Sequence, residues 1–205
     1  MTTITSPRSE LERHARRLAW GGNAWHLFEF AIALAAGIAA SSVALIAFGI
    51  DSLIELAAGG VIIWLFTGGR GASEIAERRA QRLIAVSFFA LAVYVVIGSV
   101  NAFTGQHPEA SWVGIALALV TAPTMPLLAR AKRRVGHCLG SSATTSEGQQ
   151  NMICAYLSIA LLVGLGANAV ADWWWADPIA GLVIAAVAVR EGREAWRGEV
   201  CDACS

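Results

Sequence analysis

The chain has 205 residues, of which 56% are hydrophobic and only 15% are charged. Together with a mean hydropathy of +0.57, this composition predicts an integral membrane protein rather than a soluble domain. The formal net charge of zero argues against a nucleic-acid partner, because phosphate binding requires a surplus of Lys and Arg on one surface. The four cysteines do not form the framework of a secreted disulfide scaffold, so we expect reduced thiols.

Six long apolar runs each predict one membrane crossing. A bilayer core of about 30 Å needs about 20 apolar residues of helix, and a helix satisfies its own backbone hydrogen bonds in lipid. The expected spans are Leu18–Ala39, Ser42–Phe66, Leu83–Phe103, Trp112–Ala129, Asn151–Val170 and Pro178–Val189, the last continuing as a polar segment toward Trp196. We therefore predict an all-α, six-helix transmembrane domain over residues 18–197, between cytoplasmic tails at 1–17 and 198–205.

The basic residues predict the orientation of these helices. All fifteen Lys and Arg residues fall in the N-terminal tail, in the loops after the second and fourth expected helices, or at the C-terminal end. By the positive-inside rule, both termini face the cytoplasm, and we expect a multi-pass protein of the cell membrane. The run Trp173–Trp175 predicts an aromatic anchor at the outer interface. Asp177-Pro178 then predicts a cap and a first-turn proline that begin the sixth helix.

Acidic residues inside the apolar helices are the most informative positions, because each costs about 2.5–3.5 kcal/mol at a helix centre. They are Glu29, Asp51 and Glu55. Asp51 and Glu55 are four residues apart, so their like charges lie on one helix face and repel. A bound cation would remove this repulsion; the alternative is an ionised acid paired with a neutral one. Since no Lys or Arg lies within the expected spans, we expect no buried salt bridge to neutralise these acids.

Further candidate ligands lie on the fifth and first expected helices. Glu147, Gln150 and Cys154 follow a three-and-four spacing along one face. A thiolate at Cys154 would favour zinc or a softer ion over magnesium or calcium, whereas a cysteine in a membrane helix can also be a small packing residue. His26 and Glu29, three residues apart, could be a proton relay, an entry ligand or a mutually satisfied pair.

Three cysteines near the cytoplasmic segments give weaker evidence for metal binding. Cys138 follows His137 after the basic loop, and Cys201 and Cys204 form a terminal Cys-x-x-Cys. They could capture metal in the cytoplasm, but a lone Cys-x-x-Cys is a weak signal, and a disordered tail is the alternative.

Three segments resemble the cation diffusion facilitator family, and the resemblance spans nearly all of the chain. They are SVALIAFGIDSLIE at residues 42–55, AYLSIALLVGL at residues 155–165, and WWWADP at residues 173–178. The resemblance implies six transmembrane helices, cytoplasmic termini and alternating access driven by proton exchange. It also implies that helices two and five each offer a His or Asp followed four residues later by Asp, and that these side chains hold the transported ion.

Carried over to this chain, the resemblance assigns Asp51 and Glu55 to the helix-two positions. On helix five it places Gln150 where the family has His or Asp and Cys154 where it has Asp, while Glu147 aligns with an acid common near that point. Because these ligands differ from the family pattern, the resemblance does not identify the transported ion. The cytoplasmic metal-binding domain of typical members is not expected after the sixth helix, so a homodimer would form through membrane helices.

The leading hypothesis is an exporter of a zinc-like divalent cation in exchange for protons, not an enzyme, and with no resident cofactor. Asp51, Glu55 and Cys154 are the expected ligands, Gln150 and Glu147 supplementary ligands, and Glu29 a supporting residue or proton relay. One alternative is a membrane sensor or partner-binding protein that uses the same site without transport. Others are a metal-dependent intramembrane enzyme, for which no base or nucleophile is evident, and a proton-coupled exporter of organic cations independent of Cys154.

Overall fold

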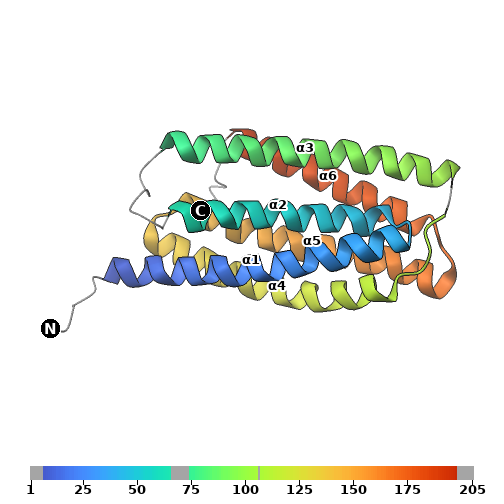
Figure 1. Ribbon diagram of the computed structural model, residues 1–205, viewed down its shortest axis with the longest axis horizontal. Coiled ribbons are helices and arrows are strands. Elements are labelled where there is room, and N and C mark those ends of the chain that lie inside the picture. The colour runs from blue at the N-terminus through green and yellow to red at the C-terminus, as the bar shows by residue number, and fades with distance from the viewer. Residues whose placement is uncertain (1–6, 66–73, 106, 198–205) are drawn as a thin grey trace, which may run out of the picture.

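The computed structural model describes residues 7–65, 74–105 and 107–197. This part of the chain forms six helices and no strand, which confirms the all-α fold. The helices are α1 (Pro7–Ala39), α2 (Val43–Leu65), α3 (Glu74–Thr104), α4 (Trp112–Leu139), α5 (Ser142–Ala171) and α6 (Ala176–Arg197). They lie side by side along the long axis of the molecule, with the start of α1 and the end of α6 toward the same end (Figure 1).

Several helices extend beyond the expected apolar spans, because hydrophobicity marks the bilayer and not the end of a helix. The basic segment Arg130–Arg134, expected in a loop, belongs to α4. A tight connection then separates α4 from α5. Gly140 adopts a left-handed conformation at φ 64°, which favours glycine, and the Ser141 side chain accepts a hydrogen bond from the Thr144 N–H.

By length and composition, four stretches among the described residues can cross a membrane. They are Val43–Val61, Ala85–Thr104, Trp112–Leu139 and Glu147–Ala171. The apolar part of α1 is interrupted by polar side chains such as Glu29, and that of α6 ends before Arg190. Six crossings therefore remain a prediction, whereas six helices are observed in the described part of the chain.

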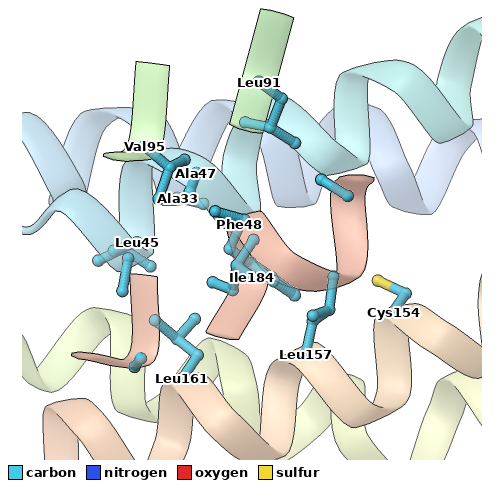
Figure 2. Packing of buried hydrophobic residues seen from close by; sticks show 14 of the residues in the cluster. Ala33, Leu45, Ala47, Phe48, Leu91, Val95, Cys154, Leu157, Leu161 and Ile184 are labelled. Carbon is cyan, nitrogen blue, oxygen red and sulfur yellow. The ribbon is translucent and has the colours of Figure 1, made fainter. Parts of the chain in front are cut away.

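Helix α2 lies at the centre of the packing. It contacts α1, α3, α5 and α6, while α4 packs mainly on α5 and α1. Phe48 of α2 is completely buried in the main hydrophobic core, together with Leu45, Leu161 and Ile184 (Figure 2). This central position turns the polar face of α2, which carries Asp51 and Glu55, toward the bundle interior.

Asp177 caps a different helix from the one that the sequence indicated. Helix α6 begins at Ala176, so Pro178 lies in its first turn as expected. The Asp177 carboxylate, however, accepts hydrogen bonds from Ser42 Oγ at 2.5 Å and from the Val43 N–H at 3.0 Å, at the start of α2. A negative charge there stabilises the helix N-terminus. The prediction that Asp177 caps its own helix was therefore wrong, and the residue joins the starts of α2 and α6.

Candidate metal site

Two carboxylates of α2 and one thiol of α5 meet inside the bundle. Asp51 and Glu55 are 4% and 3% exposed, and Cys154 is fully buried. One ligand atom from each of these residues lies within 4.8 Å of the other two. Cys154 lies beside Leu157 on α5, at one side of the packed core (Figure 2). The arrangement offers two hard oxygen ligands and one soft sulfur ligand to a single cation.

A small, partly open cavity lies beside the two carboxylates. It is lined by Asp51, Glu55, Phe88, Gln150, Ile153 and Glu191. Gln150 thus faces the same space as the two carboxylates, as its spacing from Cys154 suggested. An amide oxygen is a weak ligand that can complete the coordination of an ion held by stronger groups.

Glu191 of α6 belongs to this cavity, although the sequence did not single it out. Its side chain is only 8% exposed. Its spacing in the sequence could have indicated this position, because Glu191 follows Ile184 and Ala188 in a four-and-three pattern. All three residues are buried on one face of α6. Glu191 lies beyond the apolar stretch of α6, and burial raises its pKa to about 7, with a further increase from Glu194 and an opposing effect of Arg190.

His26 connects α1 to the site. It is 1% exposed, and its Nδ1 lies 3.3 Å from Oε2 of Glu29 and 3.1 Å from Oε2 of Glu55. On the other side of the ring, Nδ2 of Asn151 lies 2.9 Å from Nε2. The tautomer follows from the orientation of the Asn151 amide. With the amide nitrogen toward the ring, Nε2 accepts and Nδ1 carries the proton, whereas a reversed amide would accept from Nε2–H and leave Nδ1 free to ligate a cation. The sequence spacing suggested the pairing with Glu29 but not the approach to Glu55, which depends on the packing of α1 against α2.

Glu29 is held by donors from three helices. It is completely buried, and Ser52 Oγ of α2 donates to Oε2 at 3.2 Å. Thr121 Oγ1 of α4 donates to the other carboxylate oxygen. With His26 on α1, these contacts fix the carboxylate beside the ligand atoms of Glu55.

Glu147 lies in a buried ion pair instead of in either ligand cluster. Lys132 of α4 is 1% exposed, and its Nζ lies 2.7 Å from Oε1 of Glu147. The expected spans contained no Lys or Arg, so this buried salt bridge of Glu147 was not predicted. The reason is that α4 continues past its expected end, so Met125, Ala129 and Lys132 share one buried face. Among the described residues, no Lys or Arg forms an ion pair with Asp51 or Glu55.

Of the other candidate cysteines, only Cys138 lies within the described residues, and it is not part of this site. Cys138 is exposed on α4, and so is His137. The terminal Cys201 and Cys204, together with Arg70, lie outside the described residues.

A comparison with protein families bears on the whole arrangement. The family model described as the cation efflux transmembrane domain matches residues 26–197. This range contains every residue of the two ligand clusters and of the cavity. No curated protein gives a match.

Proposed function

The chain belongs to the cation efflux family, whose members are transporters, and from this premise we propose that it exports a zinc-like divalent cation in exchange for protons. The observation that carries this proposal is the buried meeting of Asp51, Glu55 and Cys154, whose ligand atoms lie within 4.8 Å of one another. Zinc accepts both carboxylate oxygen and thiolate sulfur, whereas magnesium and calcium prefer oxygen alone. Gln150, on the same cavity, is the proposed supplementary ligand.

The charges in the interior support exchange with protons. Lys132 offsets Glu147, but Glu29, Asp51 and Glu55 remain, with His26 as the only basic side chain in contact with this group among the described residues. Buried carboxylates without basic partners must hold either protons or a cation. Since metal ligands must be deprotonated to bind, protons and the cation compete for the same atoms.

The surroundings of the site favour alternating access. The ligands come from α2 and α5, which also pack against α1, α4 and α6, so a movement of helices would change which end of the bundle the cavity opens to. We place the end that carries the Arg residues of α1, α4 and α6 in the cytoplasm of a cell-membrane protein, by the positive-inside rule. A homodimer, if formed, would use the lipid-facing surfaces of the helices.

Flux measurements test this function. Purified protein in proteoliposomes with an imposed pH gradient would be tested for uptake of zinc, cadmium, cobalt and manganese. We expect gradient-dependent uptake of zinc or cadmium, its loss in Asp51→Asn and Glu55→Gln, and a decrease of at least about tenfold in Cys154→Ser. Cys138→Ser, which changes an exposed cysteine of α4, is the matched control and should transport normally.

Two results would contradict the proposal. Tight zinc binding without flux would indicate a sensor or partner-binding protein that uses the same site. Metal flux that is unchanged in Cys154→Ser would remove the thiol from the cation path.

A further inference from the structure

A second set of ligand atoms lies directly against the first. One ligand atom each from His26, Glu29 and Glu55 lies within 4.8 Å of the other two, and none of these residues is more than 3% exposed. Glu55 belongs to both sets, so the two clusters form one continuous group across α1, α2 and α5. Imidazole nitrogen with carboxylate oxygen is a ligand combination suited to zinc and cobalt.

The hydrogen bonding of Glu55 is incomplete at the junction of the two sets. Its Oε2 lies 3.1 Å from Nδ1 of His26 but forms no hydrogen bond with a described residue. The remaining hydrogen bonds of this carboxylate are a long 3.4 Å contact from Nδ2 of Asn151 to Oε1 and a contact with the Cys154 thiol. Buried carboxylate oxygens are normally well supplied with donors, so Oε2 is available to a cation that is also ligated by Glu29 and His26.

The charge of the combined group exceeds what one divalent ion can offset. Glu29, Asp51 and Glu55 together with a Cys154 thiolate would carry four negative charges, and Lys132 is already engaged with Glu147. A single divalent cation would offset two of these charges. Two divalent cations would offset all four, with His26 as a neutral ligand.

We propose that Glu55 bridges two neighbouring cation positions, the first formed with Asp51 and Cys154 and the second with His26 and Glu29. The first position rests on the proposed function; the second goes beyond it. A carboxylate has two oxygens and can ligate two ions at once, as in enzymes with paired metals. Ser52 and Thr121 hold Glu29, and Asn151 holds His26, so the second position already has the outer contacts that orient ligands.

Cobalt titration of the purified full chain in detergent tests this proposal, because a thiolate bound to Co²⁺ gives a near-ultraviolet charge-transfer band that carboxylate and imidazole ligands do not. We expect the native chain to bind two Co²⁺ ions, only one of which contributes to the band. Cys154→Ser should bind one ion without the band. Glu29→Gln, whose amide oxygen can still accept from Thr121 while its amide nitrogen donates to Ser52 Oγ, should bind one ion with the band retained.

The control is His137→Gln, which changes an exposed histidine on α4 and should still bind two ions. One Co²⁺ with a full band in the native chain, or two in Glu29→Gln, would overturn the second position. The outcome is separate from the transport test. Two bound ions without flux in proteoliposomes would support the second position and contradict transport. Flux with only one bound ion would support transport and contradict the second position.

Discussion

Lys132 of α4 and Glu147 of α5 form an ion pair inside the bundle, with 2.7 Å between Nζ and Oε1. The two side chains are 1% and 5% exposed. The pair lies where α1 and α2 also approach, because a Cβ at Gly22 would come within 2.8 Å of the lysine Nζ, and one at Gly59 within 2.9 Å of the glutamate Oε1. The buried pair therefore links α4 to α5 at a point where this hairpin packs against α1 and α2.

Removing one partner of this pair should be far more costly than removing both. Lys132→Met leaves the carboxylate of Glu147 buried without its cation, and we expect a loss of about 3–5 kcal/mol in the free energy of unfolding. The double variant Lys132→Met/Glu147→Leu should recover most of this loss. Denaturant unfolding in detergent micelles measures both.

The control for this cycle is the exposed pair of Arg190 and Glu194, with 2.8 Å between Nε and Oε1. Arg190→Met should change the free energy of unfolding by less than about 1 kcal/mol. Equal losses in Lys132→Met and the double variant would show that the pairing is not what stabilises this region.

Two adjacent glycines of α2 should respond in opposite ways to alanine. A Cβ at Gly59 would lie only 1.9 Å from Oδ1 of Asn23, so Gly59→Ala must displace this side chain beside the Lys132–Glu147 pair. We expect a loss of about 1–3 kcal/mol. A Cβ at Gly60 meets nothing within 4 Å, so Gly60→Ala should be neutral or raise stability slightly through helix propensity. Thermal unfolding of both variants in the same detergent checks the contrast, and similar shifts would contradict the close packing at Gly59.

The contact between Asp177 and the start of α2 should contribute measurably to stability. Asp177→Asn removes the negative charge that accepts hydrogen bonds from Ser42 Oγ and the Val43 N–H, so we expect a loss of about 1–2 kcal/mol in the free energy of unfolding. Asp172→Asn is the matched control. Asp172 is exposed and adopts a left-handed conformation at φ 54° that asparagine also tolerates. An equal loss of unfolding free energy in Asp172→Asn would show that the effect comes from the connection between α5 and α6 and not from the contact of Asp177 with α2.

The helices were predictable from sequence, because long apolar runs mark them independently of how they pack. Their ends and the partners of the polar residues were not. Lys132 stood in a basic segment that hydropathy assigns to a loop, and its burial depends on the pairing of α4 with α5. His26 and Glu191 reach the candidate site from two other helices, α1 and α6, and spacing within one helix cannot show such contacts. Asp51 and Glu55 could be predicted from the sequence because both lie on one face of a single helix.

The raised pKa of Glu191 predicts a pH dependence of stability. Since the pKa is about 7 in the folded chain, against an ordinary value of 4.5, the folded state binds this proton more tightly than the unfolded state. The free energy of unfolding should therefore fall as the pH rises from 4.5 to about 7, by up to about 3 kcal/mol from this group. Glu191→Gln should remove this part of the slope.

Unfolding curves at several pH values between 5 and 8 measure the effect. Glu109→Gln, at an exposed loop position, is the control and should keep the slope of the native chain. An unchanged slope in Glu191→Gln would show that Glu191 titrates alike in the folded and unfolded states.

The central claim is that the α2 carboxylates and the α5 thiol bind the same cation. Zinc-edge X-ray absorption of the purified, zinc-loaded protein tests it most directly, because a zinc–sulfur distance of about 2.3 Å is distinct from zinc–oxygen and zinc–nitrogen distances of about 2.0–2.2 Å. We predict a sulfur shell in the native chain that persists in Cys138→Ser and disappears in Cys154→Ser. Bound zinc surrounded only by oxygen and nitrogen in the native chain would contradict the claim.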